Sequence, residues 1–181
     1  MNRIRFYSAA LAALTCLATL ASGCAREKTP PDMPKLYPTS ITVTQDGAPC
    51  VDACIQLLKR DDLNYKWLAG GTTDETGTCV VKTMGKFNGA PEGDFNVIVY
   101  KTIRNESETR KNVAQPTDPA EAREWIKKVA EEEKEFDYVD TKYKKVDTSD
   151  LTITVSRGKN AVAFEVGPEV KVENVSTLQK L

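Results

Sequence analysis

Short runs in which apolar and polar residues alternate recur along most of the chain, and this feature limits the possible folds most strongly. Neighbouring side chains of a β-strand point to opposite faces, so a strand with one buried face repeats every two residues. Turn formers such as Asp46-Gly47, the stretch from Gly70 to Gly77, and Gly158-Lys159-Asn160 separate the runs. Several strands of this length predict a mainly β protein, an antiparallel β-sandwich. The runs lie near residues 41–45, 53–57, 79–81, 95–102, 151–155 and 162–166.

One segment departs from this period and predicts an inserted amphipathic helix. Asp118-Pro119-Ala120-Glu121 combines an N-cap residue, a proline at the first helical position and a capping-box glutamate. We expect a helix over about 119–136 that lies against the sandwich by its apolar stripe, with Glu131-Glu132-Glu133-Lys134-Glu135 on a solvated face. The stripe consists of Ala122, Trp125, Ile126, Val129, Ala130 and Phe136.

The first residues of the chain are typical of an export signal. Arg3 and Arg5 precede an uncharged apolar run from Phe6 to Leu20, which is short for a membrane-spanning helix. The following Ala21-Ser22-Gly23-Cys24 resembles the lipobox of bacterial lipoproteins, although that family prefers leucine where Ala21 stands. The resemblance implies a signal peptide over 1–23 and lipid attachment at Cys24, including a palmitate-type acyl chain. The alternative is an ordinary cleaved signal beside an incidental cysteine.

The rest of the chain divides into a tether, a domain and a tail. Residues 24–39 are polar and rich in proline, so we expect a tether that packs no core. The domain is expected over 40–166. In the tail over 167–181, Val170 and Val172 alternate as in an edge strand, and the end is polar.

Composition excludes several classes of function. The formal net charge of -1 provides no field that would gather nucleic acid. The chain contains no histidine, so Ser-His and Cys-His nucleophile pairs and histidine-ligated zinc are excluded. We assign no catalytic residue, no cofactor-binding residue and no metal ligand from the sequence.

Four stretches follow one another in the chain: Asp46-Gly47-Ala48-Pro49 through Leu57, Gly71 through Cys79, Gly89-Ala90-Pro91-Glu92-Gly93 through Val97, and Lys142 through Thr152 with Asn160 to Phe164. The first three resemble motifs of the carboxypeptidase regulatory-like, or transthyretin-like (prealbumin-like), domains, and the fourth is similar to the ends of some secreted lipoproteins of this type. The resemblance covers about residues 39–166 and implies an Ig-like or transthyretin-like sandwich that supports binding, adhesion or assembly. The family's hydrolase branch, which opens 5-hydroxyisourate, depends on histidines and a C-terminal Tyr-Arg-Gly-Ser. Neither is present here.

The cysteines depart from this family pattern. Cys50 and Cys79 stand at positions where the family has core residues, whereas strand alternation points Cys54 outward. A disulfide bond between Cys50 and Cys79 is therefore the favoured pairing, with Cys54 as a free thiol. A Cys50–Cys54 bridge would need a sharp bend between the two residues.

Function is predicted mainly from this resemblance: a non-enzymatic binding or structural module of the cell envelope. It would be held on a membrane by its N-terminal lipid, on the outer membrane if the source has two, and would contact an unknown envelope protein or glycan. Tyr65 and Trp67 are candidate ligand contacts, because aromatics two apart on one strand face would stack on sugar rings; the alternative is that they pack under the loop. A carbohydrate-binding or adhesion accessory protein is the second hypothesis, and a hydrolase of unknown substrate the third.

Overall fold

The computed structural model describes residues 29–174, and within them the protein is mainly β, with several antiparallel sheets and two α-helices. Met33 begins the compact unit to which the elements below belong. The expected signal peptide and the lipid-bearing Cys24 lie outside the described residues, as does the end of the tail from residue 175. No helix within 29–174 has the length and hydropathy that a bilayer-spanning segment needs.

The larger sheet has six strands in the order β13-β10-β4-β5-β7-β8, and every neighbouring pair is antiparallel. Its centre is the pair formed by β10 and β4, in which Val97 lies opposite Leu57. The strands are β4 (Cys54–Lys59), β5 (Ala69–Thr72), β7 (Lys82–Thr83), β8 (Phe87–Asn88), β10 (Gly93–Tyr100) and β13 (Thr152–Val155).

The second sheet is built around β2 (Thr39–Gln45) in the order β14-β2-β3, and β6 (Thr78–Val80) also pairs with β2. β3 (Ala48–Pro49) and β6 are antiparallel to β2, but β14 (Asn160–Glu165) runs parallel to it. The expectation of a purely antiparallel fold is therefore wrong at this pair. Alternation of apolar residues tells which face of a strand is buried, but it carries no information about strand direction.

The inward side chains of both sheets form one hydrophobic cluster. Ile41 and Val43 from β2 contribute from one sheet, and Ile55, Val97 and Phe95 from the other, all of them fully buried. Burial of each such side chain is worth about 1.5–3 kcal/mol. This layered arrangement is consistent with a β-sandwich.

Two segments outside the predicted strands belong to the sheets. The stretch from Gly70 to Gly77 was expected to be a loop, yet Gly70 and Gly71 lie inside β5. The expected tether also ends earlier than residue 39. β1 (Leu36–Tyr37) pairs with β9 (Ala90–Pro91), and Tyr37 is part of the hydrophobic core. Tyr37 continues the two-residue period of Thr39 and Ile41, so it faces the same side.

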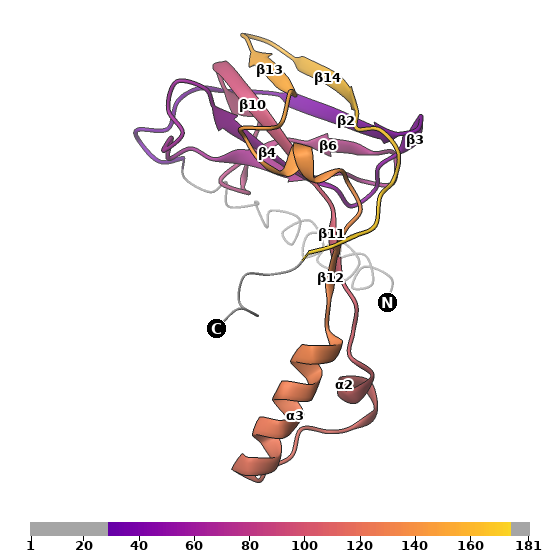
Figure 1. The fold of residues 1–181 in the computed structure, drawn as a ribbon. Helices are drawn as coiled ribbons and strands as arrows, with labels where there is room; N and C mark the ends of the chain where they lie inside the picture. The colour runs from indigo at the N-terminus through magenta and orange to yellow at the C-terminus, as the bar shows by residue number, and fades with distance from the viewer. Residues whose placement is uncertain (1–28, 175–181) are drawn as a thin grey trace, which may run out of the picture. The chain divides into compact units, whose positions relative to one another are not determined.

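A two-stranded ribbon leads from the sheets to a pair of helices (Figure 1). β11 (Thr102–Arg104) pairs with β12 (Glu135–Asp137), and between them the chain forms α2 (Glu108–Asn112) and α3 (Pro119–Glu132). We call residues 102–137 the arm. β15 (Val172–Glu173) pairs with the other side of β12, which confirms the edge strand expected at Val172. The short 3₁₀ helix η2 (Thr141–Lys144) follows the arm and contacts β10.

The expected helix begins at the predicted residue but ends early. Asp118 caps α3 and accepts hydrogen bonds from the amides of Ala120 and Glu121. Helix α3 stops at Glu132, and Phe136 instead lies in β12 opposite Ile103. Acidic residues occupy the carboxyl-terminal end of α3, where the helix dipole is negative. Repulsion between these charges and the dipole favours the end of the helix at this point. The packing was also predicted wrongly, because α3 packs on α2 rather than on the sandwich.

Candidate functional site

The aromatic pair expected to contact a ligand does not form an exposed platform. Residues 60–68 form turns rather than a strand, so the two rings do not share one strand face. Trp67 is only 9% exposed. Tyr65 is half-buried, with the Lys59 ammonium 4.7 Å from the centre of its ring. These positions agree with the alternative that the aromatics pack under the loop.

The acidic turn at Asp74 is explained by its own geometry. One carboxylate oxygen of Asp74 accepts hydrogen bonds from the Thr76 amide at 2.9 Å, the Thr76 hydroxyl at 2.6 Å and the Thr78 amide at 3.0 Å. The bond from the Thr76 side chain, followed by those from the two amides, lowers the pKa of Asp74 below its usual value. Within residues 29–174, no group of acidic or cysteine side chains is arranged to hold a metal ion.

The three cysteines of the described chain are free thiols, so the expected Cys50–Cys79 bridge is not formed. Both are buried and Cys54 is half-buried, as the alternation indicated. Cys79 pairs with Ile41, whereas the Cys50 amide bonds to the carbonyl of Val43, two residues further along β2. That offset is about 7 Å, near the upper limit for a disulfide. The Cys50 thiol instead lies 3.1 Å from Oε1 of Gln45, and burial raises the pKa values of both thiols, that of Cys79 to about 11.

The arm holds the most distinctive arrangement of side chains in the described chain. Helix α2 has only five residues, too few to be stable alone. Its amino-terminal end is capped by Glu132 of α3. One oxygen of that carboxylate accepts from the Ser107 hydroxyl at 2.6 Å and the Thr109 amide at 2.9 Å, and the other accepts from the Thr109 hydroxyl at 2.8 Å. Ser107 and Thr109 are buried by this contact.

These hydrogen bonds favour the ionised carboxylate of Glu132. The largest contribution comes from the Ser107 hydroxyl, followed by the amide and hydroxyl of Thr109, and together they lower the pKa of Glu132 to about 2. A negative charge at the amino-terminal end of α2 also matches the positive end of that helix. The link between α2 and α3 therefore depends on Glu132 keeping its charge.

The opposite end of α2 is held by the indole of Trp125. Its N–H donates at 3.1 Å to the carbonyl of Val113, the residue directly after α2. Trp125 and Glu132 are seven residues apart, so they lie on the same face of α3, two turns from each other. They contact opposite ends of α2, which therefore runs antiparallel to α3.

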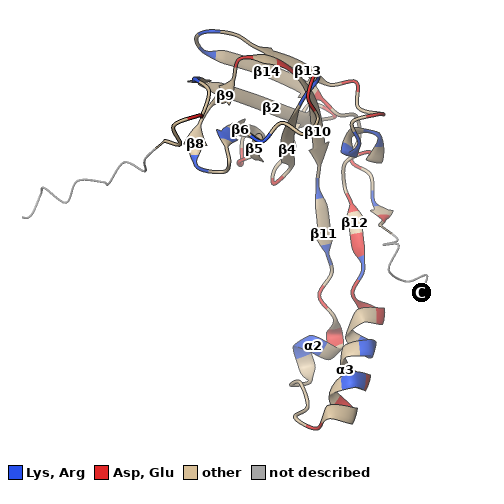
Figure 2. Ribbon diagram, turned by 90° about the vertical axis from the view of Figure 1, so that its left-hand side faces the viewer, with Lys and Arg blue, Asp and Glu red and all other residues tan. Residues whose placement is uncertain are grey.

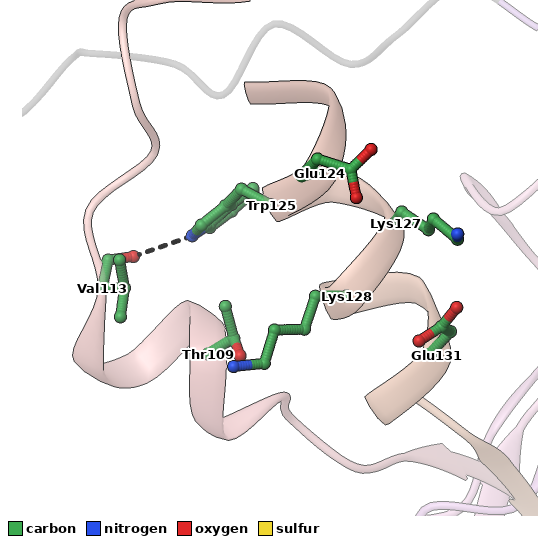
Figure 3. Close-up of a pocket in the computed structure, with 7 residues that line it drawn as sticks. All are labelled: Thr109, Val113, Glu124, Trp125, Lys127, Lys128 and Glu131. Atoms are coloured by element: carbon green, nitrogen blue, oxygen red, sulfur yellow. Dashed lines mark hydrogen bonds between the residues drawn. The ribbon is translucent and has the colours of Figure 1, made fainter. Parts of the chain in front are cut away.

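A groove of about 540 Å³ lies beside this contact. Figure 3 shows the Trp125 ring pointing from α3 toward Val113, and the side chain of Lys128 extending toward Thr109. Glu124, Lys127 and Glu131 complete the lining. Figure 2 shows that acidic and basic residues are interspersed along α3, and that β12 adds further acidic residues.

The arm also exposes large apolar side chains. Ile126 of α3 is 53% exposed, Val113 is 49% exposed and Ile103 of β11 is exposed as well. Val172 of β15, which pairs with the arm, is also exposed. The helical spacing of residues 122–130 identified this stripe, but it was expected to face the sandwich. In the structure only Val129 of α3 is buried. The stripe is thus largely left at the surface.

A partly buried ion pair fixes the base of the arm. The Lys144 ammonium, in η2, lies 2.9 Å and 3.0 Å from the two carboxylate oxygens of Asp137 in β12. Asp137 is buried and also accepts a hydrogen bond from the hydroxyl of Thr102 in β11. Sequence reasoning missed Asp137 and Lys144, because nothing in their spacing indicates that they meet.

A second, shallow depression lies on the outer face of β4 and β5. It has a volume of about 470 Å³ and includes Cys54, Gln56, Leu68 and Met84. Gly70 and Gly71 form part of its floor, since they carry no side chain over the sheet. Lys82 is the only charged residue of the described chain that lines this depression.

Comparison with known proteins adds no relative: no family model, no curated protein and no solved structure matches this chain.

Proposed function

We propose that the chain is a lipid-anchored protein of the bacterial cell envelope whose β-domain is a non-enzymatic binding module. The lipobox-like Ala21-Ser22-Gly23-Cys24 supports the anchor. In this proposal the domain displays the arm to another envelope protein. The fold is proposed to be Ig-like or transthyretin-like, which the order of the three turn motifs and the two facing sheets support.

The arm is the observation that carries the proposal. Hydrogen bonds of Glu132 and Trp125 hold its two helices together. Because these polar contacts make the link, most apolar side chains of the arm are not used for packing between the helices and lie at the surface. Protein interfaces typically combine an apolar centre and a tryptophan with a rim of charged residues. Val113 and the edge of Trp125 would supply the centre, and Glu124, Lys127 and Glu131 the rim, while Ile126 adds an exposed apolar side chain on another side of α3.

The glycan-binding alternative rested on Tyr65 and Trp67. A sugar ring needs an accessible aromatic face, and the burial of Trp67 removes one of the two. A protein partner is therefore the proposal that the described surface supports best.

Site-specific photo-crosslinking in intact cells tests the contact surface. A photoreactive amino acid at Ile126 is expected to give a discrete heavier band, which mass spectrometry identifies as an envelope protein. The same amino acid at Leu63, which is 58% exposed outside the arm, is the matched control. Equal bands from both positions, or no band from Ile126, would contradict the proposed surface.

The anchor is tested separately by the intact mass of the protein extracted from membranes. We expect a mature chain that starts at Cys24 and carries added acyl mass. An unmodified amino-terminus on protein released into the medium would exclude the lipid anchor and leave the result at Ile126 unaffected.

A further inference from the structure

The free edge of β14 is the strongest unexplained feature outside the arm. β14 is the last strand of its sheet, and among residues 29–174 no strand pairs with its other side. Natural proteins usually block such an edge with lysine, proline or a bulge. Asn160-Ala161-Val162-Ala163-Phe164-Glu165 contains neither lysine nor proline.

The hydrogen bonds to β2 fix which backbone groups remain at this edge. The Asn160 amide donates to the Pro38 carbonyl, and the Val166 amide donates to the Thr44 carbonyl. Backbone groups alternate sides along a strand, so the even-numbered residues point toward β2. The N–H and C=O groups of Ala161, Ala163 and Glu165 therefore point to the open edge.

The side chains of β14 suit the addition of another strand. Val162 and Phe164 face the core but are only partly buried, because they stand at the margin of the sandwich. Ala161 and Ala163 are exposed on the outer face and are too small to obstruct a neighbour. A strand placed beside β14 with apolar residues opposite Val162 and Phe164 would complete their burial.

The only acidic side chain of β14 is turned back onto its own sheet. The carboxylate of Glu165 accepts hydrogen bonds from the Thr44 hydroxyl at 2.6 Å and from the Asp46 amide at 2.8 Å. These contacts, the first of them most strongly, lower the pKa of Glu165. The carboxylate of Glu165 is therefore hydrogen-bonded to β2 and to the turn between β2 and β3.

We propose that the open edge of β14 binds the β14 edge of a second copy of this chain, forming an antiparallel, twofold-symmetric dimer centred on Ala163. The outward residues must face one another in an antiparallel pair. Centring on Ala163 pairs Ala161 with the partner's Glu165 and Val162 with the partner's Phe164, so apolar side chains meet on the core face and no like charges are opposed. A centre at Glu165 would oppose two carboxylates, which is destabilising.

The neighbouring registers are less favourable in other ways. A centre at Ala161 would place Val162 opposite the partner's Asn160, and a centre at Val162 would do the same with Phe164. A centre at Phe164 would place Val162 opposite the partner's Val166, which lies beyond the end of β14 and is already fully buried. Without residues 1–23 the chain carries a small net charge, 23 basic against 26 acidic residues, which produces little repulsion between two copies. The proposal concerns the β-domain and is independent of the role given to the arm.

Cysteine crosslinking of the full chain in its membrane tests this register. In the proposed dimer the two copies of residue 163 lie about 5.5 Å apart between Cα atoms, within the range for a disulfide. The two copies of residue 161 lie about 14 Å apart, outside that range. Mild oxidation should convert Ala163→Cys to a covalent dimer on the order of tenfold more efficiently than Ala161→Cys. Equal yields from both variants, or a crosslink from residue 163 to a protein of different mass, would overturn the proposal.

A backbone variant gives a second, independent measurement. Ala163→Pro removes an N–H that points to the open edge and leaves the ladder to β2 intact, a position where proline is tolerated. The full chain in detergent, measured by light scattering, should change from dimer to monomer while its circular dichroism is retained. Ala163→Ser keeps the N–H and should stay a dimer. A wild-type monomer, or a folded dimer from Ala163→Pro, would also refute the pairing.

Discussion

The β-domain and the arm are stabilised in different ways. The two sheets of the domain share a continuous apolar core that includes Phe95, Ile41 and Ile55. In the arm, Val129 is the only apolar residue that is buried, and the links between elements are made by Glu132, Trp125 and the pair of Asp137 with Lys144. The comparison teaches that polar contacts can position a segment while its apolar side chains remain at the surface. Such a segment is suited to contact a partner.

The largest effect is expected in the domain core. Phe95 is fully buried between the sheets, so Phe95→Ala should lower the free energy of unfolding by about 3–5 kcal/mol. Denaturant unfolding followed by circular dichroism measures this loss. A loss below about 1 kcal/mol would mean that the apolar core does not dominate the stability of the domain.

The next effect is expected where the arm joins the domain. Asp137→Asn leaves the half-buried Lys144 ammonium without its carboxylate partner, which should cost about 1.5–3 kcal/mol, the range for a hydrogen bond to a charged group. Hydrogen exchange should rise at the ribbon and at η2 while β4 stays protected. Lys134→Gln, which removes only an exposed ion pair with Glu173, is the control and should cost less than about 1 kcal/mol.

A smaller effect, confined to the helices, is expected from Glu132. Because its folded-state pKa is lowered to about 2, its contribution is fully present above the ordinary value near 4.5 and is lost as the pH falls toward 2. Glu132→Gln should remove this dependence and raise hydrogen exchange in α2 at neutral pH. Glu131→Gln, beside it on the exposed surface, should change neither. An unchanged acid response in Glu132→Gln would show that the carboxylate does not hold α2.

The smallest effect is expected from the indole N–H. Trp125→Phe keeps an aromatic ring but removes the donor to the Val113 carbonyl, which should cost about 0.5–1.5 kcal/mol. Faster exchange limited to residues near 113 would be seen by mass spectrometry. If exchange in the sheets rose to the same extent, the arm and the domain would unfold as one unit.

Sequence patterns predicted the local parts of this structure well. Alternation located β2, β4, β10, β13 and β14, and the cap at Asp118 located the start of α3. The remainder depends on contacts between distant residues. Ser107 and Glu132 are 25 positions apart in the chain, and no local pattern indicates that the carboxylate caps another helix. Phe136 continued the helical spacing, yet pairing with Ile103 placed it in a strand.

The candidate surface was predicted only in part. The apolar stripe of α3 was recognised, but its exposure follows from the ribbon that carries the helices, and the ribbon strands are too short for alternation to be visible. The buried faces of Cys50 and Cys79 were predicted correctly. The distance between these two residues along β2, which decides whether they can form a disulfide, depends on the registers of β3 and β6 and has no local pattern.

Native-state hydrogen exchange of the full chain tests the central comparison most directly. The opening free energy of amides in α3 should be well below that of amides in β10, and Glu132→Gln should lower the first and leave the second unchanged. Equal opening free energies in the two segments, lowered together by this variant, would contradict the claim that the arm is held separately from the sandwich.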